Sequence, residues 1–219
     1  MGRYRVKTIT ASSIRALVSV APALLWLPGA ALAHHFMDDA LPGTFVQGLL
    51  SGLGHPLIGV DHAAFIIAAG FLLALARGGL WGVATLIAGS LAGAALHLQG
   101  LDLPDGEVGV ALSVVLIGGL VMARQRIALS WLAGGLAFAG VLHGHAYAET
   151  IFGAEAAPLG AYLLGFSLVQ FGVATAVLLA HRRIIATRAA WSAPVSAGLG
   201  AVTGSVGAVF LILNLAVPS

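Results

Sequence analysis

Residues 55–76 read HPLIGVDHAAFIIAAGFLLALA, a long apolar stretch that opens with two histidines and an aspartate. Because about 20 consecutive apolar residues are enough to cross a bilayer, residues 57–76 predict a membrane-spanning helix. Imidazoles and a carboxylate are costly to place at the mouth of such a helix, and there they typically serve ion handling or proton chemistry. The octapeptide from His55 to His62 is therefore the first candidate for a functional site.

The rest of the chain also has the composition of a membrane protein. Hydrophobic residues make up 59% of it and charged residues 8%, against about 25% charged residues in an ordinary soluble domain. The chain has no cysteine, so thiolate metal sites and a cysteine nucleophile are excluded, and nitrogen or oxygen atoms must hold any metal. No G-x-x-x-x-G-K-[ST] motif occurs, so we do not expect the polypeptide to be an ATPase.

The first 33 residues have the pattern of an export signal. Four basic residues precede an apolar run over 16–27, and the small-residue triplet Ala31-Leu32-Ala33 follows it. We therefore predict a signal peptide over 1–33, cleaved after Ala33, which leaves 34–219 as a single transmembrane domain. The alternative is that the run remains as an uncleaved first transmembrane helix.

Beyond the signal, the apolar runs predict an all-α membrane protein with six transmembrane helices. The segment from Thr44 to Leu53 is too short to span and is interpreted as an interfacial or re-entrant helix before the first span. Glycine pairs four residues apart predict close helix packing in lipid. The six predicted spans cover 57–76, 80–98, 107–123, 127–147, 158–180 and 191–217.

The charges predict the orientation of this bundle. After the signal, every basic residue falls in the loops after the first, third and fifth predicted helices, and every acidic residue lies toward the other side. Basic loops stay in the cytoplasm. We therefore predict a multi-pass protein of the bacterial inner (cytoplasmic) membrane, with both termini of the mature chain in the periplasm.

Seven of the eight histidines map to the predicted periplasmic side, which suggests a site open to the outside. The exception, His181, is interpreted as part of a basic interfacial cluster with no special role. His97 could simply be solvated at the interface, and His34 and His35 could be chance tail residues or, with a free terminal amine, a metal chelator. The seven residues are His34, His35, His55, His62, His97, His143 and His145.

Helix geometry indicates which of these side chains can converge. Pro56 suits the first turn of a helix, and residues seven apart return to one helical face, so His55 and His62 can meet on it. Asp61 could join them as a ligand if the backbone is distorted near Gly59, or it could orient a histidine of another helix.

The second histidine pair has two possible arrangements. On a regular helix His143 and His145 point to opposite faces, and His145 then aligns with Glu149. Alternatively, unwinding at Gly144 would bring both imidazoles inward.

These motifs resemble those of the HupE/UreJ family of membrane proteins. The resemblance rests on His34-His35-Phe36-Met37, on the run from Ser51 to His62, and on His143-Gly144-His145-Ala146-Tyr147-Ala148-Glu149 with Gly153-Ala154-Glu155 after it, and it covers essentially the whole chain. Family members are regarded as nickel or cobalt permeases that supply hydrogenase, urease or cobalamin-related needs. The resemblance implies a secondary-type permease for Ni²⁺ or Co²⁺, with no permanent cofactor.

The expected metal ligands are His55, Asp61, His62, His143 and His145, together with His97, Glu149, His34 and His35. The principal alternative is a zinc-dependent intramembrane hydrolase, with Ser51 or Ser90 as polar assistants. A third possibility is a metal-binding accessory protein that does not transport.

The expected partners are a divalent metal ion and the lipid bilayer, and no nucleic acid. A homo-oligomer and an energising partner both remain open.

Overall fold

The structure is a computed structural model that describes residues 41–124 and 127–216. Within these residues the chain forms seven helices and no strand, which confirms the all-α prediction. The predicted signal peptide, His34 and His35 lie outside the described residues. The helices are α2 (Phe45–Ile58), α3 (Val60–Leu73), α4 (Gly79–Leu98), α5 (Gly106–Ala123), α6 (Leu129–Glu149), α7 (Ala156–Thr187) and α8 (Ala189–Ala216).

Four of these helices, α4, α5, α7 and α8, are long and apolar enough to cross a membrane. The pair α2 and α3 passes the same criterion when taken together, although the two helices are bent by 78° at their junction. α6 has 21 residues but carries two histidines and a terminal glutamate, and it falls outside this set. The chain is therefore a multi-pass membrane protein.

The first predicted span, 57–76, is wrong as a continuous helix. The chain is helical through Pro56 to Ile58, bends at Gly59, and starts a new helix at Val60. With 14 residues, α3 is only about 21 Å long, short of the hydrocarbon core of about 30 Å. The short helix predicted before it exists as α2, which begins with a capping box at Thr44 and Gln47 and extends beyond Leu53.

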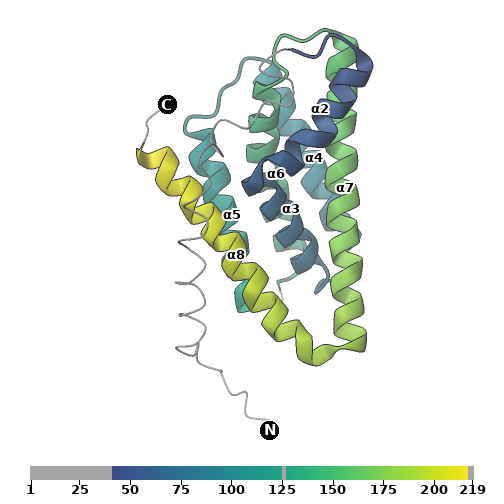
Figure 1. Cartoon of the computed structure of the whole chain (residues 1–219), viewed down its shortest axis with the longest axis vertical. Helices are drawn as coiled ribbons and strands as arrows, with labels where there is room; N and C mark the ends of the chain where they lie inside the picture. The colour runs from purple at the N-terminus through teal and green to yellow at the C-terminus, as the bar shows by residue number, and fades with distance from the viewer. Residues whose placement is uncertain (1–40, 125–126, 217–219) are drawn as a thin grey trace.

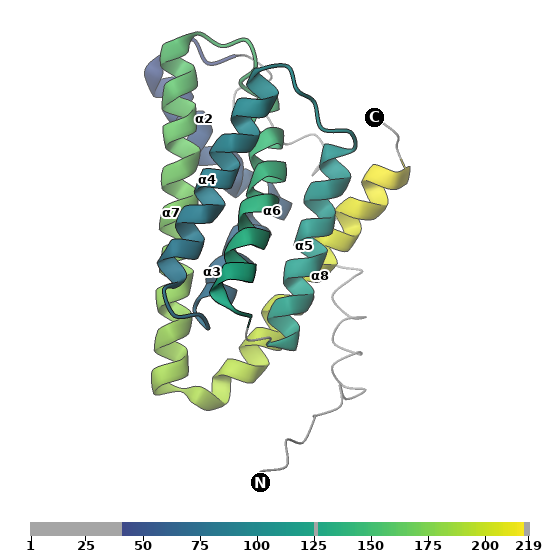
Figure 2. The same cartoon turned by 180° about the vertical axis from the view of Figure 1, so that it is seen from behind.

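The loops divide between the two ends of the bundle (Figures 1 and 2). The α4–α5 and α6–α7 loops lie at one end, near the start of α2, and the loops after α3, α5 and α7 lie at the other. The first end, here called the acidic end, carries Asp102, Asp105, Glu107, Glu149 and Glu155. The second, the basic end, carries Arg77, Arg124, Arg182, Arg183 and Arg188.

Glycines allow the helices to pack backbone against backbone, as the sequence predicts. The closest pairs of helices are α4 with α6, α5 with α8, and α2 with α7. A side chain at Gly93 would overlap the backbone of Val141, and one at Gly52 would overlap the backbone of Tyr162. In lipid, where burial alone does not drive association, such close contact supplies much of the attraction between helices.

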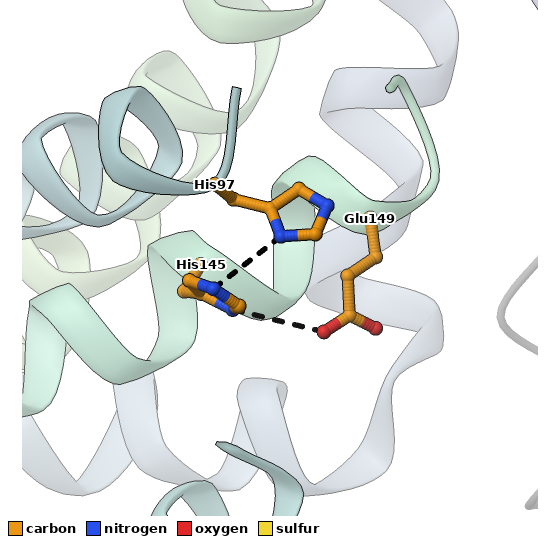
Figure 3. A group of neighbouring side chains, drawn as sticks. All are labelled: His97, His145 and Glu149. Carbon is orange, nitrogen blue, oxygen red and sulfur yellow. Dashed lines mark hydrogen bonds and ion pairs between the residues drawn. The ribbon is translucent and has the colours of Figure 1, made fainter. Parts of the chain in front are cut away.

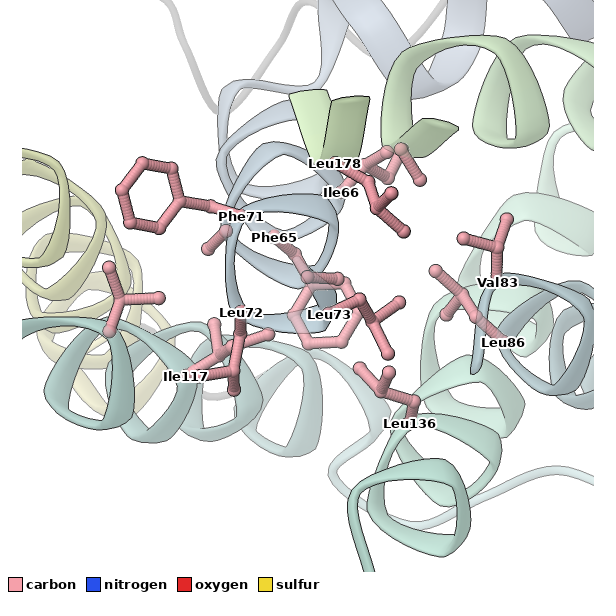
Figure 4. Close-up of a cluster of buried hydrophobic side chains, with 14 of the residues drawn as sticks. Phe65, Ile66, Phe71, Leu72, Leu73, Val83, Leu86, Ile117, Leu136 and Leu178 are labelled. Atoms are coloured by element: carbon pink, nitrogen blue, oxygen red, sulfur yellow. The ribbon is translucent and has the colours of Figure 1, made fainter. Parts of the chain in front are cut away.

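α3 lies at the centre of the bundle, and its apolar side chains form the middle of the core (Figure 4). Phe65, Leu72 and Leu73 are almost completely buried. They pack against side chains from the surrounding helices, among them Leu86, Ile117, Leu136 and Leu178. This packing holds the first turn of α3, which carries Asp61 and His62, inside the bundle.

Candidate metal centre

The structure places the predicted ligands that it describes in two clusters, and among these residues only the second cluster has three ligand atoms within 4.8 Å of one another. His55, Asp61, His62 and His143 form what we call the buried cluster, since each is at most 5% exposed. His97, His145 and Glu149 form what we call the rim cluster, which lies at the acidic end and includes an exposed carboxylate.

The two histidines at the centre of the buried cluster face each other directly. Nδ1 of His62 lies 2.7 Å from Nδ1 of His143. At this separation the nitrogens share one proton, so one ring donates to the lone pair of the other. The pair therefore joins α3 to α6 through a single exchangeable hydrogen.

α5 and α3 hold the far side of the His143 ring. Oγ of Ser113 lies 2.9 Å from Nε2 of His143 and also donates to the carbonyl oxygen of Val110 at 2.7 Å. The ring of Phe65 packs on His143 with centroids 4.2 Å apart. His143 is thus oriented from both sides before any ion arrives.

His55 reaches the cluster from the last turn of α2. Its ring lies edge-on to that of His62, with centroids 5.7 Å apart, across the bend at Gly59. The Tyr162 hydroxyl lies 2.7 Å from the carbonyl oxygen of Tyr147 and 2.8 Å from Nδ1 of His55. Nδ1 of His55 also lies 3.2 Å from Oγ1 of Thr150, so hydroxyl groups at the acidic end of the bundle orient the ring. The two histidines converge as predicted, but through the bend between two helices.

Asp61 occupies the first turn of α3 and is 1% exposed. One of its oxygens accepts the backbone N–H of His62 at 2.8 Å. Asp61 also interacts electrostatically with the nearby Tyr147, whose buried hydroxyl makes no hydrogen bond to the described residues. A carboxylate and an unsatisfied hydroxyl in a buried site leave polar capacity that a cation or water can use.

The rim cluster has the spacing of a metal site (Figure 3). Nδ1 of His97 lies 3.3 Å from Nε2 of His145, and Nδ1 of His145 lies 3.7 Å from Oε1 of Glu149. One ligand atom from each residue lies within 4.8 Å of the others. Nε2 of His145 also lies 3.2 Å from both the backbone nitrogen of Leu103 and the carbonyl oxygen of Leu101, and its Nδ1 makes no hydrogen bond to the described residues.

α6 is a regular helix through His143 and His145, so it does not unwind at Gly144. The two imidazoles point to opposite faces, and one helix supplies a ligand to each cluster. Gly144 serves a different purpose, because a side chain there would overlap the backbone of Ser90 on α4.

Two acidic residues at the acidic end join the predicted ligands. Oδ1 of the exposed Asp102 lies 3.2 Å from Nδ1 of His97. Glu107, half-buried in the first turn of α5, interacts electrostatically with both Asp61 and Glu149. It is therefore near enough to one carboxylate of each cluster to feel its charge. In the sequence both residues are recognisable only as acidic groups of the periplasmic side, because nothing in their spacing connects them with a histidine.

His181 differs from its predicted role as an interfacial residue. It is 1% exposed, stacks on the ring of Phe71, and its Nδ1 lies 2.8 Å from the carbonyl oxygen of Phe71. The next residue, Arg182, donates to the carbonyl of Ala76 at 2.8 Å. His181 therefore helps to fasten the end of α3 to α7.

The serines considered for a hydrolase do not meet the histidines in this structure. Oγ of Ser90 bonds to the carbonyl of Leu86 and to Oε1 of Gln170, both at 3.1 Å. Ser51 lies half-buried in α2.

Comparison with known proteins yields one family. The model of the HupE / UreJ protein family matches residues 22–210. Over 120 residues the chain is 32% identical to "Protein HupE" of Rhizobium leguminosarum bv. viciae, an alignment that covers 54% of this chain and 63% of that relative. No solved structure matches the chain.

Proposed function

The chain belongs to the HupE / UreJ family, and on this premise we propose that it is a secondary-type permease for uptake of a divalent transition metal, Ni²⁺ or Co²⁺. The rim cluster captures the ion, and the buried cluster receives it. Imidazole nitrogens with a few carboxylates suit these borderline ions better than they suit Mg²⁺ or Ca²⁺, which prefer oxygen ligands alone.

The observation that carries the proposal is the difference between the two histidine pairs. With metal–nitrogen bonds of about 2.0–2.1 Å, two ligand nitrogens lie about 3.3 Å apart in tetrahedral coordination and about 2.9 Å apart at the 90° angle of square-planar or octahedral coordination. The rim pair, His97 and His145, already has the tetrahedral separation, at 3.3 Å. One ligand atom from each of His97, His145 and Glu149 lies within 4.8 Å of the others, which supports the rim cluster as the place where the ion binds first.

The buried pair is too close to hold an ion in the same way. With 2.7 Å between the nitrogens of His62 and His143, an entering ion must displace the shared proton and push the rings about 0.2–0.6 Å further apart, depending on its coordination geometry. Metal binding then releases a proton, as is general for histidine sites. Because the two rings must move apart to hold the ion, their return to the hydrogen-bonded pair favours release of the ion. Transport requires such release.

Charge favours the acidic end as the entrance. Among the described residues, this end carries five carboxylates and no lysine or arginine. The resulting negative potential raises the local concentration of cations. His34 and His35, which lie outside the described residues, are proposed to add donors at the same entrance.

The proposed topology has six crossings, with the acidic end in the periplasm and the basic end in the cytoplasm. The bent pair α2–α3 forms the first crossing, and α6 forms the fourth. With a signal peptide removed after Ala33, both termini of the mature chain face the periplasm of a bacterial inner membrane. The metal would serve a hydrogenase or urease.

The proposal is tested by uptake of labelled nickel and cobalt into cells that express the chain, and into proteoliposomes. We expect accumulation by the wild type and its loss in His62→Ala at equal protein level. The matched control is Glu155→Gln, because Glu155 is an exposed acidic residue of the same end whose side chain makes no capping hydrogen bond to α7. Equal uptake by the wild type and His62→Ala would contradict the proposed role of the buried cluster.

A zinc-dependent hydrolase is the second candidate, and the buried histidine pair with Asp61 is the observation that favours it. Such an enzyme would retain stoichiometric zinc through purification and would lose turnover on chelation. If empty and protein-containing vesicles accumulate nickel and cobalt equally while tightly held zinc supports hydrolysis of a lipid or amide, the hydrolase replaces the permease. A noncatalytic accessory protein would bind metal but would neither accumulate it in vesicles nor catalyse hydrolysis.

A further inference from the structure

An apolar groove of about 500 Å³ runs between α5 and α6. α5 packs mainly against α8, and α6 packs mainly against α4 (Figure 2), so the seam between α5 and α6 is only partly filled. Phe65 and Leu72 of α3 form part of its lining, and Ser113 is its single polar side chain. Exposed Leu116 and Phe138 lie among the side chains that line it.

The groove is long enough for the acyl chain of one leaflet. Its lining on α5 extends from Gly109 to Leu120, within a helix that runs from Gly106 to Ala123, and is about 16 Å long. Half of a hydrocarbon core of about 30 Å is about 15 Å, so a chain that enters from the basic end reaches past the middle of the bilayer. Because α5 is a membrane-spanning helix by length and composition, the groove opens to lipid chains.

The end of the groove near Leu120 lies at the basic end of the bundle. Arg124 follows α5 directly and is exposed, and its guanidinium touches Ser192 through one nitrogen at 3.4 Å. Trp131, which lines the same end of the groove, is 80% exposed. Arginine and tryptophan at one level are typical of the boundary between membrane and water. A positive charge there complements the phosphate of a lipid headgroup.

We propose that the groove binds one acyl chain of an anionic glycerophospholipid from the leaflet at the basic end, with its headgroup phosphate at Arg124. The inner end of the groove reaches Ser113, whose Oγ lies 2.9 Å from Nε2 of His143. The bound chain thus closes the buried cluster off from the membrane and fills the space between α5 and α6. Lipid binding in this groove does not require that the protein transport a metal.

Two adjacent glycines of α6 provide a matched test. A side chain added at Gly134 or at Gly135 would meet nothing within 4 Å, but only Gly135 lines the groove. The full chain is purified from membranes containing phosphatidylglycerol and phosphatidylcholine, and retained lipid is counted by native mass spectrometry. We expect the wild type and Gly134→Trp to retain one phospholipid, mainly phosphatidylglycerol, and Gly135→Trp to lose most of it.

A second variant tests the headgroup contact. Arg124→Gln should still retain a phospholipid but lose the preference for phosphatidylglycerol over phosphatidylcholine. Gel filtration and thermal unfolding check that Gly135→Trp folds like Gly134→Trp, and Gly135→Leu replaces it if it does not. Equal lipid retention by the wild type, Gly134→Trp and the folded Gly135 variant would overturn the proposal. So would a lipid-free dimer that the Gly135 variant converts to a monomer, because the occupant would then be a second copy of the chain.

Discussion

At the scale of single residues, the main feature is the placement of His143 and His145 on opposite faces of α6. Successive residues of a helix are turned by about 100°, so two residues separated by one position point in nearly opposite directions. One short motif therefore supplies a ligand to the buried cluster and another to the rim cluster. The two clusters can be disabled separately.

The first prediction concerns this separation. Purified wild-type protein should bind two nickel ions, and His143→Ala and His145→Ala should each bind one, because each removes a ligand from a different cluster. Isothermal titration measures the stoichiometry, and the double variant should bind none. Loss of both ions in either single variant would indicate one shared site.

The second prediction concerns Glu107, the half-buried carboxyl group that interacts electrostatically with Asp61 and Glu149. Glu107→Gln keeps the shape of the side chain but removes a carboxylate that can hold a cation, so we expect uptake to fall by about 10–100-fold, the range typical of residues that support metal ligands. Glu107→Asp should restore part of it. Labelled-nickel uptake is the measurement, with Glu155→Gln as the control, and equal uptake by the Gln variant and wild type would remove Glu107 from the pathway.

At the scale of elements, the bend at Gly59 is decisive. It redirects the chain by 78° and brings His55 from the end of one helix to His62 at the start of the next. A continuous helix over 57–76 would have presented the two rings along one face and left α2 without its contact to α7.

The third prediction tests this bend. The backbone angles at Gly59, φ −65° and ψ 104°, suit alanine, but its Cβ would come within 2.7 Å of Cδ2 of His62. Gly59→Ala should therefore displace the His62 ring and lower nickel uptake by about tenfold or more while the protein remains folded. Gly119→Ala, where a side chain meets nothing within 4 Å, is the control. Unchanged nickel uptake in Gly59→Ala would mean that the position of the His62 ring does not affect transport.

The fourth prediction concerns the contact between α4 and α6. Gly144→Ala places a methyl group against the backbone of Ser90, which neither helix can avoid without moving. Overpacking of this kind costs about 1–3 kcal/mol, so thermal unfolding in detergent should occur at a lower temperature than in Gly134→Ala. An unfolding temperature equal to that of Gly134→Ala would show that α4 and α6 can move apart to accept the methyl group without loss of stability.

At the scale of the whole molecule, the charged side chains of the described residues, apart from the buried Asp61, collect at opposite ends of the bundle, while the histidine clusters lie toward the acidic end. The loop after α3, which carries Arg77, and the junction of α7 with α8, at Arg188, share the basic end because the helices from α3 onward alternate in direction (Figure 1).

The fifth prediction is the orientation that follows. Reporters fused after Arg77 and after Arg188 should read cytoplasmic, and reporters after Asp105 and after Glu155 should read periplasmic. Mass spectrometry of the purified protein should find His34 as its first residue. A cytoplasmic reporter at Glu155 would contradict six crossings, and an intact N-terminus would contradict signal cleavage.

The sequence by itself determined the helical class, the membrane environment, the family, the close packing at glycine pairs and the separation of charge along the chain. These properties depend on composition and on local spacing, because lipid leaves the backbone few alternatives to helix. The sequence also predicts the pairing of His145 with Glu149, since residues four apart share a helical face.

Only the tertiary structure decided where α3 begins, which histidines meet, and how Asp102 and Glu107 join them. His62 and His143 are 81 positions apart, and nothing in local periodicity specifies a contact at that distance. The same holds for His181, whose burial depends on the fit of α7 against the end of α3. The bend at Gly59 and glycine contacts such as Gly144 against Ser90 set the register between the helices. This register brings side chains from separate sequence motifs together in the two clusters.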